Sequence, residues 1–168
     1  MGFVGRLAEE KNLPLLIETI KKLNDVDLTL KLFGEGPERE SLEKLVKKHN
    51  LSSKVFFAGR VESKDDIYSE IDILILPSKI EVFPMVILEA MARKVLVIAS
   101  DVGDVNKIVK DGYNGYLFQP SDKKQLEEKV RLAINNEKMT NVIVRNALAS
   151  VKKYSAQTMT KNYLTLFE

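Results

Sequence analysis

Two carboxylates eight positions apart are the residues whose types and spacing most directly suggest chemistry. Glu81 and Glu89 bracket a proline and an otherwise apolar run. Paired carboxylates can act as nucleophile and acid on a glycosidic bond, or they can accept hydrogen bonds from the hydroxyl groups of a ligand. Pro84 suits the first turn of a helix, so we expect Glu81 in the loop before that helix and Glu89 about a turn and a half inside it. A carboxylate on an apolar helix needs a partner, either protein or ligand.

The elements that would position these residues alternate between strand and helix. Apolar patterns predict strands over residues 3–4, 28–33, 54–58, 72–76, 95–99 and 116–118. They predict helices over residues 13–23, 37–49, 65–70, 84 onward, 105–109, 123–135, 139–154 and 156–166, with Asn12 as the N-cap of the first. This alternation indicates an α/β fold with a parallel sheet of about six strands and right-handed crossovers, followed by a helical C-terminal tail.

In such a sheet, ligands bind outside the carboxyl ends of the strands, so the segments that follow each strand matter most. Glycine, charged and hydroxyl residues gather there, in residues 5–11, 34–37, 59–61, 77–81 and 100–103. Loops are often polar and rich in glycine for conformational reasons alone. That tendency does not explain why two cations, Arg6 and Lys11, flank the first turn and why Glu81 follows the fourth strand.

Composition and missing motifs exclude several classes of protein. The 168 residues, 45% of them hydrophobic, suffice for one globular domain. A net charge of +2, with lysines beside glutamates, argues against nucleic-acid binding. The longest apolar runs are too short to span a bilayer, the first residues lack a signal-peptide core, and cysteine is absent, so we expect a cytoplasmic protein without thiolate metal sites. The first strand is not followed by Gly-x-Gly-x-x-Gly, a P-loop is missing, and His49, the only histidine, belongs on the surface of a lysine-rich helix.

Several short motifs lie in order around the predicted sheet edge. They are Gly5-Arg6-Leu7 with Lys11, Gly34-Glu35-Gly36-Pro37, Phe57 to Val61, Pro77-Ser78, the Glu81 and Glu89 pair, Ser100 to Gly103, and Asp111 to Phe118. Each is weak alone, but together they resemble the C-terminal half of retaining glycosyltransferases of the GT-B fold, family four or group 1. The resemblance covers most of the chain. It implies a single Rossmann-like, three-layer α/β/α domain over residues 1–168 that binds a nucleotide-diphospho-sugar.

The resemblance also implies roles for individual residues. Arg6 and Lys11 would hold the donor diphosphate, Glu81 would meet the sugar hydroxyls, and these three form the expected catalytic group. Glu89 would accept hydrogen bonds from the ribose. The other implied donor-binding positions are Gly5, Gly34, Glu35, Gly36, Arg60, Val61, Val82, Phe83, Pro84 and Met85. A cationic clamp can replace a metal ion on a leaving diphosphate, so no metal or other cofactor is expected, and the leaving phosphate is expected to help deprotonate the acceptor on the same face.

The same residues allow simpler interpretations when they are considered one by one. Arg6 and Lys11 could be exposed loop cations or partners of the neighbouring Glu9 and Glu10. Glu81 could complement the dipole of the following helix. Glu89 could pair with Arg93, four positions on, for a few tenths of a kcal/mol. Glu35 could be an ordinary turn residue at a helix start.

The chain departs from the family pattern at a few positions. Val82 stands where glycine usually follows the first glutamate, Asp104 replaces a second glycine after Gly103, and Asn106-Lys107 replaces the usual Pro-Glu pair. The N-terminal acceptor domain of a GT-B enzyme is also missing, so we expect the chain to bind nucleotide sugar without efficient turnover. Any peripheral membrane association would come only through the full-length enzyme. The alternative is a non-catalytic nucleotide-sugar binding or interaction module. A related nucleotide-sugar epimerase is disfavoured, because such enzymes generally rely on further histidines and acids that this sequence does not offer.

Overall fold

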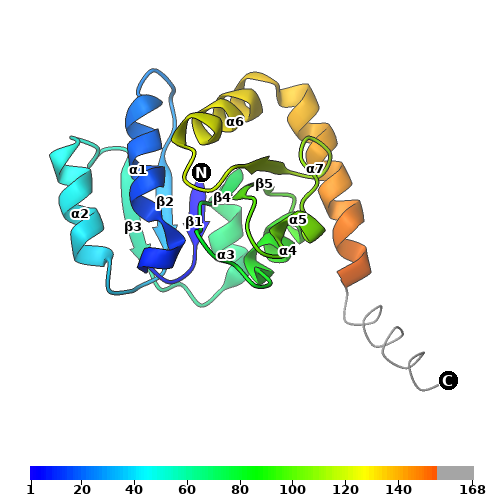
Figure 1. Ribbon diagram of the computed structural model, residues 1–168, viewed down its shortest axis with the longest axis horizontal. Helices are drawn as coiled ribbons and strands as arrows, with labels where there is room; N and C mark the ends of the chain where they lie inside the picture. The colour runs from blue at the N-terminus through cyan, green and yellow to red at the C-terminus, as the bar shows by residue number, and fades with distance from the viewer. Residues whose placement is uncertain (155–168) are drawn as a thin grey trace.

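The computed structural model describes residues 1–154 and consists of a six-stranded parallel sheet flanked by helices (Figure 1). The strands are β1 (Gly2–Val4), β2 (Leu30–Phe33), β3 (Val55–Gly59), β4 (Ile73–Leu76), β5 (Leu96–Ser100) and β6 (Tyr116–Phe118). Their order in the sheet is β3-β2-β1-β4-β5-β6, and each neighbouring pair is parallel. The predicted Rossmann-like α/β fold is therefore confirmed.

The strand order reverses between β1 and β4, and this reversal distributes the helices over both faces. The helical elements are η1 (Glu9–Lys11), α1 (Leu13–Lys22), α2 (Arg39–Lys48), α3 (Lys64–Ser69), α4 (Met85–Ala92), α5 (Val105–Ile108), α6 (Lys123–Asn135), α7 (Glu137–Val151) and η2 (Lys152–Tyr154). Figure 1 shows α1 and α2 in front of the sheet and α3 and α4 behind it. Right-handed crossovers that run in opposite directions require this arrangement, and sheets of this kind bind ligands at the carboxyl ends of the strands where the order reverses, here β1 and β4.

The central strands form the core because both of their faces are covered. All four residues of β4 and all five of β5 are buried. Continuous apolar strands of this kind are typical of parallel sheets. On α1, the buried side chains include Leu13, Leu16 and Ile20, whose helical spacing directs one stripe onto the sheet. Full burial of one such side chain stabilises a fold by about 1.5–3 kcal/mol.

The structure revises a few local predictions. Asn12 precedes α1 as expected, but its side chain makes no capping hydrogen bond. It adopts a left-handed conformation with φ of 51°, and its N–H donates to the carbonyl of Glu9, so it closes η1 instead. Asparagine tolerates this conformation better than most residues. Pro84 lies immediately before α4 rather than in its first turn. The predicted helix over residues 156–166 lies outside the described residues.

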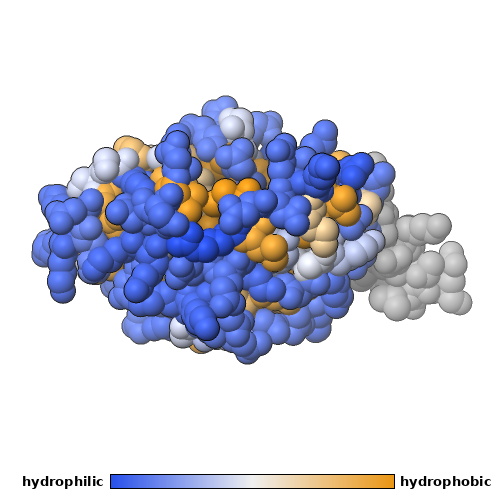
Figure 2. Space-filling model, turned by 90° about the horizontal axis from the view of Figure 1, so that it is seen from above, coloured by the Kyte–Doolittle hydropathy of each residue, from blue (hydrophilic) through white to orange (hydrophobic). Residues whose placement is uncertain are grey.

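The amino edge of the sheet carries a hollow whose lining mixes apolar side chains with the polar Asp27, Thr29, Asp72 and Thr140. Figure 2 looks onto this edge from above and shows apolar side chains gathered on it. The hollow has a volume of about 410 Å³, and its lining includes Met1, Leu28, Ile73 and Ile134. It lies at the opposite end of the strands from the predicted ligand edge, so none of the predicted site residues line it.

Candidate functional site at the carboxyl edge

Backbone hydrogen bonds join the first two loops at the carboxyl edge. The N–H of Gly5 donates to the carbonyl of Phe33 at 2.9 Å, and the N–H of Leu7 donates to the carbonyl of Glu35 at 3.0 Å. Gly34 has φ of 137°, and a Cβ added there would overlap the carbonyl oxygen of Gly5. Glycine is thus required at position 34 by both conformation and space. The structure brings the predicted glycines of these two loops together at one edge.

Lys11 and Glu81 form the polar centre of this edge. The ammonium Nζ of Lys11 lies 2.6 Å from Oε1 of Glu81, with the two side chains only 20% and 10% exposed. The hydroxyl of Ser78 donates to the same carboxylate oxygen at 2.7 Å. The simpler interpretations of Lys11 are therefore wrong, because its side chain is only 20% exposed and pairs with neither Glu9 nor Glu10. Glu81 turns toward the first loop.

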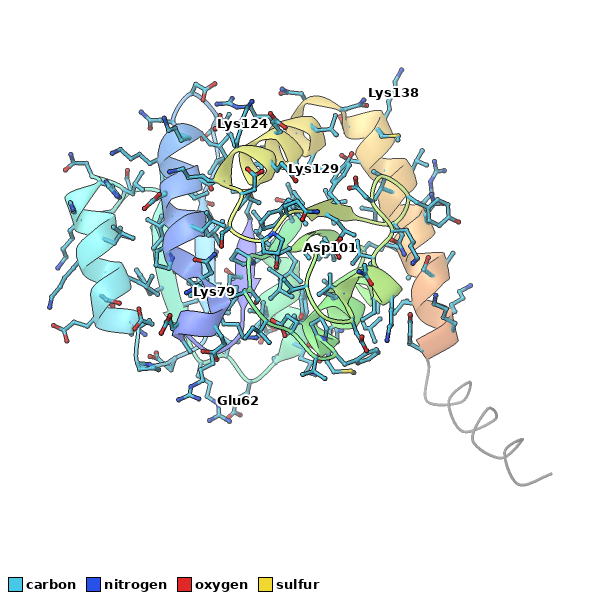
Figure 3. All side chains as sticks on the ribbon, viewed as in Figure 1. Glu62, Lys79, Asp101, Lys124, Lys129 and Lys138 are labelled. Carbon is cyan, nitrogen blue, oxygen red and sulfur yellow. The ribbon has the colours of Figure 1, made fainter. Side chains whose placement is uncertain are left out.

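The loop after β4 is tied to the first loop by a second residue. The backbone N–H of Lys79 donates to the carbonyl of Glu10 at 2.8 Å, and its ammonium lies 3.1 Å from Oε1 of Glu9. In Figure 3, Lys79 lies at mid-height in the view, and Glu62 projects from the loop after β3 at the lower edge. The loops after β1 and β4 are consequently held as one unit, and this explains how residues 70 positions apart, Lys11 and Glu81, meet.

Glu89 has protein partners on α3 rather than on its own helix. Its Oε2 accepts a hydrogen bond from the Tyr68 hydroxyl at 3.1 Å, and its Oε1 pairs with the ammonium of Lys64. The side chain is only 17% exposed, so most of it is buried. The alternative pairing with Arg93 is wrong, because that guanidinium contacts Asp65 at 2.7 Å and reaches only the backbone carbonyl of Glu89.

The Tyr68 hydroxyl is held in its neutral, donating form. Burial raises its pKa above the ordinary value of 10.0, and the carboxylate of Glu89 adds to the effect. A neutral phenol has one proton to donate. The acceptors within reach of that proton are Oε2 of Glu89 and the more distant backbone carbonyl of Val86. Tyr68 therefore orients the carboxylate, which leaves the solvent side of Glu89 to Lys64 or to a ligand.

The other three charged residues among the predicted positions fall into two groups. Glu35 pairs with Arg39 on α2, whose guanidinium also stacks over the ring of Phe57. Arg6 and Arg60 are exposed, and within residues 1–154 neither guanidinium forms a hydrogen bond or ion pair. An unpaired arginine keeps all its donors for a ligand. The structure thus leaves Arg6 open where Lys11 is engaged.

The positions that depart from the family pattern are accommodated by the fold. Val82 is 80% exposed, so its side chain displaces no neighbour. The carboxylate of Asp104 lies 2.8 Å from the ammonium of Lys107, three positions on, which offsets the added negative charge. Gly103 packs directly on the loop of Glu81, since a Cβ there would overlap the carbonyl oxygen of Glu81.

Sequence reasoning missed the partners of the two carboxylates. Ser78 and Ser100 enter the sequence prediction only as members of motifs, and the sequence predicts no role for Lys64 or Tyr68. The one sequence signal for these serines is their position at the carboxyl ends of buried strands. Ser78 follows β4 by two residues, and Ser100 is the last residue of β5. Among residues 1–154, no His, Asp and Glu group of three or more could hold a metal ion, and the need for one stays untested.

Comparison with known proteins decides the family. A family model described as glycosyl transferases, group 1, matches residues 1–149. The chain belongs to this family. The group 1 chain is 38% identical over 156 residues to an uncharacterized glycosyltransferase of Methanocaldococcus jannaschii, a match that covers 91% of this chain and 43% of the relative. It is 31% identical to the alpha-D-kanosaminyltransferase of Streptomyces kanamyceticus, over 86% of this chain and 39% of that enzyme. The group 1 chain thus spans less than half the length of these curated relatives.

Solved structures share the fold of this group 1 chain. The C-terminal domain of a group 1 glycosyl transferase from Francisella tularensis is 30% identical, with a TM-score of 0.82 over 92% of this chain and 85% of that one. Anabaena HepE, solved in complex with UDP, is 24% identical with a TM-score of 0.93 over 99% of this chain and 47% of that one. The second likeness shows the fold alone. Within residues 1–154, no helix is long and apolar enough to cross a membrane.

Proposed function

We propose that this chain is the donor-binding half of a group 1 glycosyltransferase and binds a nucleotide-diphospho-sugar at the carboxyl edge of its sheet. The observation that carries the proposal is the ion pair of Lys11 with Glu81, together with the unpaired guanidinium of Arg6 in the same loop after β1. Two cations and a carboxylate match a ligand that joins a diphosphate to a polyhydroxylated sugar. The topological switch between β1 and β4 supports the same location.

In the proposed complex, each group contacts one part of the donor. Arg6 and Lys11 bind the diphosphate and stabilise the charge that builds on it as it leaves. Glu81 accepts hydrogen bonds from the sugar hydroxyls, and Glu89 accepts them from the ribose. The backbone N–H groups of Phe83, Met85 and Val86, just before and at the start of α4, face the phosphate and sugar, together with the positive end of the helix dipole.

The proposed reaction retains the configuration of the sugar. The bond between the anomeric carbon and the diphosphate breaks, the acceptor oxygen bonds to that carbon on the same face, and the departing phosphate takes the acceptor's proton. Because this chain covers 43% of its Methanocaldococcus relative, transfer is proposed for a complete two-domain enzyme with an acceptor-binding half. The 168 residues alone are proposed to bind without efficient turnover.

A titration with nucleotides tests the proposed binding. UDP is the first probe because HepE was solved with UDP and with UDP-glucose, and GDP and ADP follow. A nucleoside diphosphate at 100 times its Kd should raise the free energy of unfolding by ~2.7 kcal/mol. The stabilisation should disappear in Glu89→Gln and persist in Glu137→Gln, which carries the same change at the start of α7. Stabilisation by none of the three nucleotides would overturn the proposal.

A second candidate is a non-catalytic module that binds nucleotide sugar or another protein through the same edge. The specific observation in its favour is the exposed apolar set beside Glu81, namely Ile80, Val82, Phe83 and Met85. Acceptor-dependent transfer by the complete protein would exclude this candidate. Binding of nucleotide sugar without any transfer by the complete protein would favour it.

A further inference from the structure

One oxygen of the Glu81 carboxylate is engaged twice and the other is left open. Lys11 and Ser78 both donate to Oε1, at 2.6 and 2.7 Å. Within residues 1–154, Oε2 accepts no hydrogen bond. A carboxylate whose first oxygen is fixed by two donors, and whose second oxygen has no partner, is oriented to accept a hydrogen bond from a ligand hydroxyl. The two donors differ, however, because only the ammonium of Lys11 is proposed to bind the phosphate as well.

Ser78 is buried and is itself held in place. Its side chain is fully inaccessible, as is that of Ser100. The hydroxyl of Ser100, the last residue of β5, donates to the carbonyl of Ser78 at 2.5 Å, with the carbonyl of Leu76 as the alternative acceptor at 3.3 Å. The hydroxyl of Ser100 therefore links the ends of two core strands. Buried networks whose members are all paired are rigid.

We propose that Ser78 and Ser100 are positioning residues that keep the Glu81 carboxylate aimed at the donor sugar while Lys11 moves to the diphosphate. The inference rests on the proposed function, in which Lys11 serves the diphosphate and Glu81 the sugar. When the ammonium shifts toward phosphate, Glu81 loses one of its two donors. The Ser78 hydroxyl remains, because its place is set by β4 and β5 and not by the ligand.

Loss of a positioning residue should weaken binding of the nucleotide sugar more than binding of the nucleoside diphosphate. Loss of a merely structural residue would weaken both to the same extent. Without the Ser78 hydroxyl, Glu81 is held by Lys11 alone, and the carboxylate then turns with the ammonium. Recognition of the sugar should suffer, whereas Arg6 and Lys11 still bind the diphosphate. The ratio of the Kd values for a nucleotide sugar and for its nucleoside diphosphate therefore reports the position of Glu81.

The test is calorimetric titration of the full chain with UDP and UDP-glucose, and with the corresponding GDP-mannose and ADP-glucose pairs. Ser78→Ala should weaken binding of the nucleotide sugar about tenfold and change nucleoside diphosphate binding by less than about threefold. Ser100→Ala should also weaken binding of the nucleotide sugar more than binding of the nucleoside diphosphate, with a smaller difference between the two. Ser150→Ala is the matched control, because that hydroxyl also donates to a backbone carbonyl, on α7, and it should change neither Kd.

The outcomes separate this inference from the proposed function. If the wild-type chain binds none of the nucleotides, the proposed function fails and the inference fails with it. If the wild-type chain binds and Ser78→Ala leaves the ratio of the two Kd values unchanged, the inference alone is overturned. Should Ser78→Ala fail to fold, Ser78→Cys takes its place, since a thiol fills similar space with a weaker donor.

Discussion

Lys11 and Glu81 lie 70 positions apart in the chain and share an ion pair of 2.6 Å at the carboxyl edge of the sheet. Both side chains are mostly shielded from water, so each depends on the other more than an exposed pair would. The pair connects the loop after β1 to the loop after β4. It therefore contributes both to the stability of this edge and to the arrangement of charge that the donor would meet.

A double-mutant cycle measures this dependence. Lys11→Met and Glu81→Gln should each lower the free energy of unfolding, because each leaves a partly buried group without its partner. The double mutant should lose less than the sum, with a coupling energy of about 0.5–3 kcal/mol in urea denaturation. Additive losses would show that the two side chains do not interact in solution.

Arg6 should matter for ligand binding and not for folding. Its guanidinium has no partner within residues 1–154, so Arg6→Ala should change the free energy of unfolding by less than about 0.5 kcal/mol. The same variant should weaken nucleoside diphosphate binding at least about tenfold, since a charge-assisted contact to phosphate is lost. Arg145→Ala, at an exposed position of α7, is the control. Equal affinities for the two variants would remove Arg6 from the diphosphate site.

Gly103 should be far less replaceable than Gly112. Both have positive φ, 52° and 70°, so alanine at either position costs about 1–2 kcal/mol in backbone conformation. A Cβ at position 112 meets nothing within 4 Å, whereas one at position 103 overlaps the carbonyl oxygen of Glu81. Gly103→Ala should therefore cost at least about 3 kcal/mol. Denaturation of the two variants measures the difference, and similar losses would mean that the loops are not packed together.

Tyr68 should make stability depend on alkaline pH. Its pKa is raised in the folded chain by burial and by Glu89. The folded chain keeps the phenolic proton at pH values where the unfolded chain has lost it. The free energy of unfolding is therefore unaffected by this group below about pH 10, and it falls as the pH rises further. Tyr68→Phe should show a shallower fall in stability between pH 9.5 and about 11 than the wild type does. Identical slopes would contradict this explanation.

The alternation of strand and helix could be read from the sequence because it is a local property. Continuous apolar runs such as residues 72–76 match strands that are covered on both faces, and the stripe on α1 follows helical spacing. The order of loops along the chain then placed Gly5, Gly34 and Glu81 at one edge, since all parallel strands end on the same side. Element boundaries shifted by a residue or two, because turns such as that at Asn12 depend on tertiary hydrogen bonds.

The sequence by itself determined the fold class, the edge at which polar residues gather and the family to which those residues point. Only the tertiary structure decided which charge pairs with which. Glu89 pairs with Lys64 of another helix and not with Arg93, four positions away. Lys11 likewise pairs with Glu81 and not with its neighbours Glu9 and Glu10. The physical reason is that partner choice depends on how separate elements pack. A side chain pairs with the group that the buried core brings within about 3 Å, whatever its distance along the chain.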